Sequence, residues 1–284
     1  MTPAQARRPK PRLPLTHVAA YAVLVTFAVV FLTPYVWAVF ESFKPRADAD
    51  AGGLLPRAWT LDNYGAAFNF SYPPYVFKPD YLHSTIVALG VALATLLTST
   101  LVGFVLAVYR FRGKETLFTL LIVAFMVPFT GVMVPLYVTV VRLGLDNSLG
   151  ALIVTGLWSP FGILVMRQFL EGFPTEMLEA ARIDGAGEWR LVARMILPLC
   201  TPALGILAIY TFMHSWDDFL WPTIILHDPT KWTLPLLVSY FTDSSFPAPF
   251  VMAVAMLTIL PVLIVYALVA RFFIRGIGAV ALHV

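Results

Sequence analysis

The sequence predicts an all-α integral membrane protein with six transmembrane helices. Hydrophobic residues make up 59% of the 284-residue chain, charged residues only 12%, and six long runs contain no Asp, Glu, Lys or Arg. An ordinary soluble domain has about 25% charged residues. Too few polar groups remain to cover a soluble globule, which excludes a soluble enzyme, a nucleic-acid-binding domain and a disordered chain. The single cysteine, Cys200, excludes an intrachain disulfide and a cysteine-based metal cluster.

Each of the six runs is long enough to span a membrane as one helix. A spanning helix needs about 20 apolar residues, because the hydrocarbon layer is roughly 30 Å thick. The alternation that is typical of membrane barrels is absent from the sequence. A seventh run, Phe219–His227, is too short to span. The six predicted helices cover Val18–Phe40, Tyr81–Tyr109, Thr116–Val141, Asn147–Met166, Met195–Trp216 and Ser244–Ala270.

The distribution of Lys and Arg predicts the orientation. With the N-terminus in the cytoplasm, thirteen of these residues fall in cytoplasmic segments and six in extracytoplasmic ones. Cytoplasmic loops carry the excess of positive charge in membrane proteins. We therefore expect both termini in the cytoplasm, residues 1–17 as a basic N-terminal segment, 41–80 as an extracytoplasmic loop and 272–284 as the C-terminal segment.

The first helix, residues 18–40, is expected to be a retained anchor. A cleaved signal peptide is the alternative, since Arg7 to Arg12 precede the helix. However, the apolar core of a signal peptide is usually about 7–15 residues long and is followed by a small-residue cleavage site. This run is longer and has no clean site of that kind.

The two longer extracytoplasmic segments are rich in proline and aromatic residues. Segment 41–80 fits an interfacial aromatic belt with a packed cap, or a docking surface for an external partner. Segment Trp221–Ser245 is expected to fold back into the bundle. Prolines within the predicted helices would bend them and free backbone carbonyls, as static kinks or as the hinges of a transporter; they are Pro128, Pro135, Pro160 and Pro261.

The long cytoplasmic loop, residues 167–194, is expected to form a helical hairpin. Pro174 and Thr175 precede a helix whose first turns carry Glu176, where the helix dipole favours negative charge. Gly185 is a natural stop, and a second helix is expected over Glu188–Leu197. The loop is either a connector on the lipid headgroups or a docking element. Its acidic first helix has no Lys, which favours docking.

The loop resembles the signature loop of bacterial ABC importer permeases. The resemblance rests on Glu179-Ala180-Ala181, then Gly185 and, further on, Leu197-Pro198. The fuller string resembles the carbohydrate-uptake branch, the MalG-like permeases. Further similarities lie at Thr60–Tyr64, Phe111–Lys114, Val134–Tyr137, Ser215–Pro222 and Arg271–Gly276. The sequence departs from the family at Met195, His83, Asp217 and the C-terminal end, where the usual Lys-Gly is missing.

The resemblance implies a type I ABC importer permease fold, with a five-helix core domain over residues 81–271. It implies that the first loop helix docks on a cytoplasmic ATPase, whose closure on ATP rocks the bundle from inward-open to outward-open. The residues expected to couple the two subunits are Glu179, Ala180, Ala181, Asp184, Gly185 and Pro198.

The implied assembly contains a second permease subunit, two copies of the ATPase and an extracytoplasmic solute-binding protein, in a bacterial or archaeal cytoplasmic membrane. The chain lacks the Gly-x-x-x-x-Gly-Lys-Ser/Thr loop that cradles phosphates, since Gly113-Lys114 is followed by Glu115. We therefore expect ATP and Mg²⁺ on the partner ATPase, and no catalytic residue, metal or cofactor in this chain.

The sequence leaves three transport functions to compare. A permease for a sugar or sugar-like solute is the leading prediction, and a permease for a phosphorylated polyol such as glycerol phosphate is the alternative. A secondary transporter would need carboxylates near the membrane midplane, and the six runs contain none. A membrane enzyme is weaker still, because His83 and His214 are isolated from other metal ligands in the sequence.

Trp216, Asp217 and Asp218 are the candidates for the translocation pathway. Asp217 lies about 19 residues after Pro198, or roughly 28 Å along a helix, near the outer boundary of the membrane. The carboxylates could simply end the helix among the headgroups. Alternatively, a carboxylate beside an indole ring suits a polyhydroxylated solute, since the acid accepts hydroxyl hydrogen bonds and the ring covers the apolar sugar face. Such carboxylates would repel a phosphate.

Overall fold

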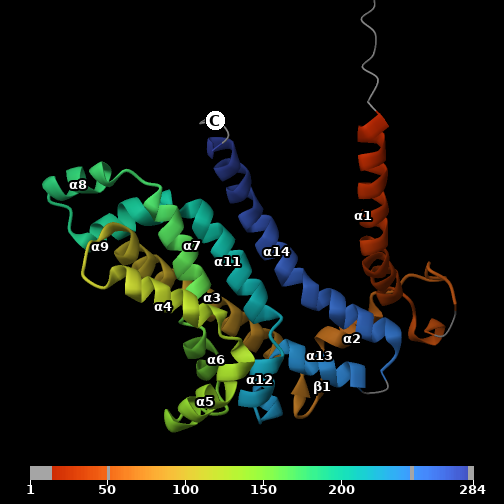
Figure 1. Ribbon diagram of the computed structural model, residues 1–284. Coiled ribbons are helices and arrows are strands. Elements are labelled where there is room, and N and C mark those ends of the chain that lie inside the picture. Colours follow the sequence, from red (N-terminus) through yellow and green to blue (C-terminus); the bar gives the residue numbers. More distant parts are fainter. Residues whose placement is uncertain (1–14, 50–51, 244–245, 281–284) are drawn as a thin grey trace, which may run out of the picture.

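The computed structural model describes residues 15–49, 52–243 and 246–280, and these form a mostly helical chain (Figure 1). The predicted basic stretch Arg7 to Arg12 lies outside the described residues. The first half contains α1 (Leu15–Ser42), η1 (Arg46–Asp48), α2 (Asp62–Phe68), β1 (Ser71–Tyr72), β2 (Tyr75–Val76), α3 (Phe77–Val108), α4 (Lys114–Met126) and α5 (Phe129–Arg142).

The second half contains the loop that resembles the family signature. Its elements are α6 (Leu149–Thr155), α7 (Pro160–Glu171), α8 (Thr175–Ile183), α9 (Glu188–Leu191), the π-helix η2 (Val192–Ile196), α10 (Leu197–Leu199), α11 (Thr201–Trp216), α12 (Leu220–Ile225), η3 (Pro229–Lys231), α13 (Leu234–Asp243) and α14 (Ala248–Val280). The two short strands pair as an antiparallel hairpin.

Three helices of the described chain, α1, α3 and α14, are continuous, long and apolar enough to cross a membrane. The other three predicted spans are broken. The axes of α4 and α5 differ by 100°, those of α6 and α7 by 42°, and those of Glu188–Leu199 and Thr201–Trp216 by 80°. The described residues therefore hold three candidate spans, or six if each bent pair crosses as one. The predicted count of six transmembrane helices therefore stays a prediction.

Proline accounts for the position of each break. Val127 is extended, as is usual before a proline, and α5 begins directly after Pro128. Pro160 starts α7, where its missing N–H costs no helical bond. Pro198 and Pro202 flank the break at Cys200. The predicted bending is thus confirmed near Pro128 and Pro160, whereas Pro135 and Pro261 lie within α5 and α14.

Helix α3 is the centre of the bundle and packs against α6, α7, α11 and α13. Glycines allow its close approach to α7: a Cβ at Gly103 would lie 2.7 Å from Met166 Cβ. Hydroxyl groups of α3 also donate hydrogen bonds to backbone carbonyls at the break between α6 and α7. Thr95 donates to the carbonyl of Gly156 at 2.8 Å, and Thr98 to that of Leu157 at 2.7 Å. The irregular backbone is therefore hydrogen-bonded by a neighbouring helix.

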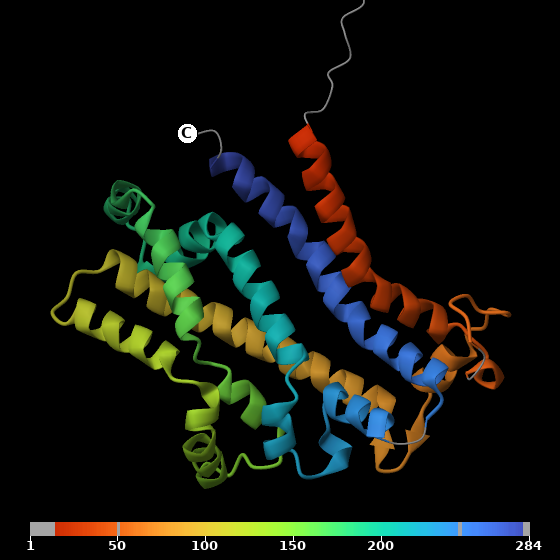
Figure 2. The same ribbon diagram turned by 45° about the vertical axis from the view of Figure 1, so that its right-hand side comes forward.

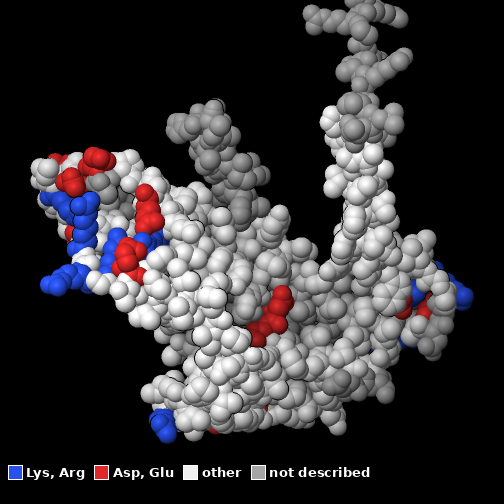
Figure 3. Space-filling view, viewed as in Figure 1, with Lys and Arg blue, Asp and Glu red and all other residues white. Residues whose placement is uncertain are grey.

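The molecule has two distinct ends. Figures 1 and 2 show the start of α1, the helix α8 and the end of α14 towards one end, which we call the α8 end. Helices α2, α12 and α13 lie towards the opposite end, the α13 end. Charged side chains collect near these ends in Figure 3, and the band between them is almost free of charge on this face except for one acidic patch. This pattern suits a protein that crosses a membrane between the two ends.

Helix α1 stands apart from the bundle and lies beside α14 (Figure 2). None of its apolar window is buried within the described chain. Phe27, Phe31 and Tyr35, for example, are all more than half exposed. An apolar helix exposed in this way requires lipid or another protein chain around it.

Segment 41–80 forms a packed cap at the α13 end. Lys44 Nζ lies 2.6 Å from Glu41 Oε2, and both side chains are buried. Asn63 Nδ2 donates to the carbonyls of Ser42 and Lys44. The ring of Phe70 packs edge-on against Phe241, at 4.8 Å between centroids. The packed cap predicted from the sequence is confirmed for these residues.

Candidate functional site

Helix α8 ends in a hydrogen-bonded turn that depends on glycine. Gly185 has φ +83°, a backbone conformation that L side chains rarely adopt. Gly185 N donates to the carbonyl of Arg182 at 3.0 Å, and Ala186 N donates to that of Ala181 at 2.9 Å. These two bonds form a Schellman motif, which satisfies carbonyls left free at the end of the helix. The stop predicted at Gly185 is confirmed.

One side of α8 is exposed and the other is anchored. Glu179, Ala180, Asp184 and Gly185 are exposed, and Ala181 is half-buried. Apolar side chains share the exposed surface, since Ile183 is 85% exposed. Small and apolar groups next to carboxylates form a surface that a partner protein can approach closely. The sequence-predicted residues of α8 and its turn therefore lie together at the surface.

Leu178 anchors α8 to the bundle. Its side chain is 5% exposed and belongs to an apolar cluster with Phe104, Met166 and Cys200. Burying a leucine side chain contributes about 1.5–3 kcal/mol. Leu178 therefore holds one face of α8 against the bundle. The exposed residues lie on the other faces of the helix.

Arg182 ties α8 to two other elements. Its Nε donates to Glu188 Oε1 at 3.0 Å, across the turn that joins α8 and α9. Its Nη2 lies 3.4 Å from the hydroxyl of Tyr109, directly after the end of α3. The guanidinium carbon is also 5.5 Å from the centre of the Tyr109 ring. The hydrogen bonds with Glu188 raise the pKa of Arg182 above its ordinary value, so the group stays charged.

Pro198 lies on the second half of the hairpin, apart from Gly185. It is exposed, and it follows the π-helix η2 within the short helix α10. Cys200, at the 80° break, is fully buried. The chain thus leaves the hairpin through an irregular, proline-flanked corner before α11 begins.

Asp217 and Asp218 lie between α11 and α12, towards the α13 end of the molecule. Asp217 is exposed and Asp218 is half-buried. The Asp218 carboxylate accepts a bond of 3.4 Å from Trp221 N at the start of α12. Burial raises the pKa of both carboxyl groups. The hydrogen bond from Trp221 N lowers the pKa of Asp218 in part. Asp217 is thus the more accessible of the two carboxylates.

Trp216 lies inside the bundle. Its side chain is 1% exposed, and its Nε1 donates to the carbonyl of Thr258 in α14 at 3.1 Å. The indole ring packs against Tyr81 and Phe212, with 5.6 Å between centroids in each case. Trp216 therefore joins α11 to α3 and α14 in this structure, and its ring faces packing partners.

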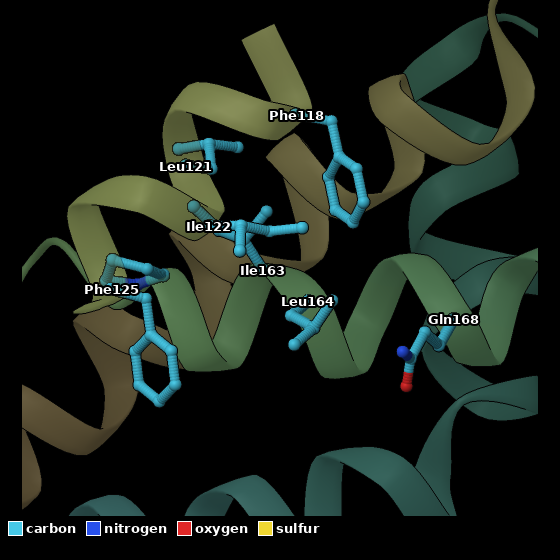
Figure 4. A pocket seen from close by; sticks show the side chains of 8 residues that line it. Phe118, Leu121, Ile122, Phe125, Ile163, Leu164 and Gln168 are labelled. Carbon is cyan, nitrogen blue, oxygen red and sulfur yellow. The ribbon is translucent and has the colours of Figure 1, made fainter. Parts of the chain in front are cut away.

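An apolar cavity lies between α4 and α7 (Figure 4), and none of the candidate residues is among those that line it. Its volume is about 270 Å³. Of the described residues that line it, Gln168 is polar and seven are apolar: Phe118, Leu121, Ile122, Phe125, Pro160, Ile163 and Leu164. Such a lining suits hydrocarbon better than a polyhydroxylated solute.

Sequence reasoning missed the residues that hold the hairpin in place. Tyr109 and Arg182 are 73 positions apart, and nothing in the spacing of the sequence brings them together. Arg167 was also missed: its Nε donates to Glu171 at 2.7 Å, its Nη2 lies 3.3 Å from Glu115, and it stacks on Phe118. A cation directly after a predicted span, such as Arg167, is a usable signal because it needs a partner there.

Comparison with known proteins assigns the family. Residues 99–278 match the family described as the binding-protein-dependent transport system inner membrane component, and this match includes α8 and most of the bundle. The chain belongs to this family.

Curated relatives are similar over nearly their whole length. The chain is 31% identical to the arabinooligosaccharides transport system permease protein AraQ of Halalkalibacterium halodurans, over 89% of this chain and 91% of AraQ. It is 29% identical to the lactose transport system permease protein LacG of Rhizobium radiobacter, over 92% of this chain and 95% of LacG. It is 28% identical to the sn-glycerol-3-phosphate permease protein UgpE of Agrobacterium fabrum, over 93% and 96%.

A solved structure has the same fold. A bacterial ABC transporter involved in the import of the acidic polysaccharide alginate contains a chain that matches with a TM-score of 0.78 and 21% identity, over 93% of this chain and all of that chain. A second alginate transporter structure, in complex with an alginate-bound periplasmic protein, matches with a TM-score of 0.67. The described chain therefore has the ABC importer permease fold.

Proposed function

We propose that this chain is one of the two permease subunits of an ATP-driven importer and forms half of the pathway for a sugar or sugar-like solute. The observation that carries the proposal is the family match across residues 99–278. AraQ and LacG, which are named for oligosaccharide and lactose transport, support the solute class.

Helix α8, the first helix of the hairpin, is proposed to dock on a cytoplasmic ATPase subunit with the turn that ends it. Its exposed residues, its glycine turn and its single anchoring leucine support this role. Glu179 would meet a basic or polar group on the ATPase, while Ala180 and Ala181 permit close approach. Two ATPase subunits bind and hydrolyse ATP with Mg²⁺, one for each permease. The α8 end and both termini then lie in the cytoplasm.

The opposite end is proposed to face an extracytoplasmic solute-binding protein. Asp217 lines the outer pathway or its gate, and Trp216 supports it from within the bundle. The exposed carboxylate would accept hydroxyl hydrogen bonds and repel a phosphate. The negative charge of Asp217 therefore disfavours glycerol phosphate as the solute, although the chain is similar to UgpE.

Reconstitution of the chain with its second permease, ATPase and binding protein tests the proposal. Proteoliposomes are loaded with ATP and Mg²⁺ and offered arabino-oligosaccharides, lactose, another disaccharide or glycerol phosphate. We expect ATP-dependent uptake of a neutral saccharide. Uptake of glycerol phosphate alone would overturn the solute class, and uptake without ATP would overturn the importer mechanism.

A further inference from the structure

Helix α8 has few attachments through which a movement could reach the membrane helices. Its anchoring side chain is Leu178, whose apolar contacts have no fixed direction. Within the described residues, the side-chain hydrogen bonds of α8 are those of Arg182 to Glu188 and Tyr109. Arg182 therefore provides the directional contact between α8 and the bundle.

The three residues lie at a junction of separate elements. Arg182 is in the last turn of α8, and Glu188 is the first residue of α9. Tyr109 is the C-cap of α3, and its ring packs edge-on against Phe104, with 5.7 Å between centroids. We call this group the Tyr109–Arg182–Glu188 clamp. It joins the hairpin to the end of the central helix.

The geometry makes the clamp sensitive to the angle of α8. The guanidinium is planar, with donors in fixed directions, and here it reaches both carboxylate oxygens of Glu188 at 3.0 and 3.3 Å. The same group lies near the hydroxyl and the ring of Tyr109. Rotation of α8 must break these contacts or carry the end of α3 with it. Because α3 packs against α6, α7, α11 and α13, its displacement would reach most of the bundle.

The clamp contributes little to stability. The side chains of Arg182 and Glu188 are 33% and 50% exposed. Ion pairs with this exposure are well solvated and add little to the free energy of folding. The fold is held by the apolar clusters instead, so loss of the clamp leaves the bundle intact and alters the orientation of the hairpin.

We propose that Arg182 is a positioning residue that fixes α8 against the end of α3 and thereby transmits the movement of a docked ATPase to the permease bundle. The inference rests on the proposed function, because it requires an ATPase at α8. It adds a specific route for the coupling, from α8 through Tyr109 to α3. Arg182, Tyr109 and Glu188 were not among the residues expected to couple the two subunits.

The test compares Arg182→Ala with Arg182→Lys, Tyr109→Phe and Glu188→Gln in the reconstituted complex. Arg190→Ala is the matched control, since Arg190 is an exposed arginine of the same hairpin with no side-chain hydrogen bond among the described residues. Three quantities are measured for each variant: the ATPase that co-purifies, the rate of ATP hydrolysis and the solute taken up per ATP hydrolysed.

We expect Arg182→Ala to retain the ATPase but to take up at least about fivefold less solute per ATP. A fivefold change lies at the lower end of what ordinary coupling free energies produce. Arg182→Lys keeps the charge without the planar fork and restores part of the coupling. Arg190→Ala behaves as the wild type. Adding Tyr109→Phe to Arg182→Ala causes no further loss, because both changes act on one contact.

Unchanged uptake per ATP in Arg182→Ala would overturn the inference, as would loss of ATPase co-purification, which would make Arg182 a docking residue. If Arg182→Ala does not accumulate in the membrane, Glu188→Gln is compared with Arg190→Ala instead. Less solute taken up per ATP in Glu188→Gln would support the inference, and equal uptake per ATP would overturn it. Failure of the proposed function is distinguishable, because the wild-type complex would then show no ATP-driven uptake.

Discussion

The backbone at Gly185 shows how one residue determines the shape of the hairpin. The helix-forming sequence before it ends in a glycine with φ +83°, and the resulting Schellman motif directs the chain back towards α9. A Cβ at this position would meet no neighbouring atom. The need for glycine is therefore conformational rather than steric.

Gly185→Val is expected to distort the turn, because a β-branched residue is strongly disfavoured at positive φ. The backbone strain would cost about 1–3 kcal/mol and would be confined to the turn. We expect ATPase co-purification or uptake to fail while the membrane helices still insert. Gly187→Val is the matched control, since Gly187 has φ −72° and also has open space at its Cβ. Equal activity of the two variants would show that the Gly185 turn is not required.

Asp217 permits a second prediction for a single residue. Asp217→Asn should have a mild effect on uptake, whereas Asp217→Leu should reduce uptake without affecting assembly of the complex. Burial raises the pKa of Asp217, so its charge is lost on acidification at a higher pH than that of an ordinary aspartate. Protonated Asp217 is uncharged, as Asn is, so uptake by the wild type should fall only mildly as this group is protonated. Uptake by Asp217→Asn should not change over that pH range.

Asp228→Asn is the control for this pH profile. Asp228 is half-buried. Its hydrogen bonds with Thr230 lower its pKa, so it remains charged to lower pH than an ordinary aspartate. Its replacement should leave the profile unchanged. Full transport by Asp217→Leu would show that Asp217 only ends the helix.

At the scale of elements, the contact between α3 and α7 brings the two backbones close together. Gly103→Leu should be destabilising, because even a Cβ would lie 2.7 Å from Met166 Cβ and 3.1 Å from Arg167 N. Overpacking of this kind costs about 1–3 kcal/mol. Gly131→Ala is the control, since its nearest neighbour would be Pro128 Cγ at 3.8 Å. Thermal unfolding in detergent should show a lower Tm for Gly103→Leu alone.

The sequence predicted the elements better than their directions. Uncharged runs located the helices, and Gly185 located the turn, because these features follow from local chemistry. Proline predicted a bend at Pro128, but its local effect does not determine a 100° change of direction, which depends on the packing of α4 and α5. The burial of Trp216 and the contact of Arg182 with Tyr109 depend on partners distant in the chain.

At the scale of the whole molecule, the two groups of candidate residues lie towards opposite ends. The α8 end presents the hairpin, and the α13 end presents the packed cap and Asp217. The orientation proposed from the distribution of Lys and Arg places the α8 end in the cytoplasm. Ala186→Cys, made on a Cys200→Ala background, should therefore not react with an impermeant thiol reagent added to intact spheroplasts. Ala58→Cys, at an exposed position in segment 41–80, should react. The opposite pattern would reverse the orientation.

The docking of α8 on an ATPase is the central claim, and protection of one engineered thiol tests it most directly. Ala180→Cys on the Cys200→Ala background is labelled in inside-out vesicles with and without the ATPase subunit. The account predicts rapid labelling of the free permease and strong protection once the ATPase is bound, because Ala180 is exposed and lies within the proposed interface. Equal labelling with and without a bound ATPase would contradict the claim.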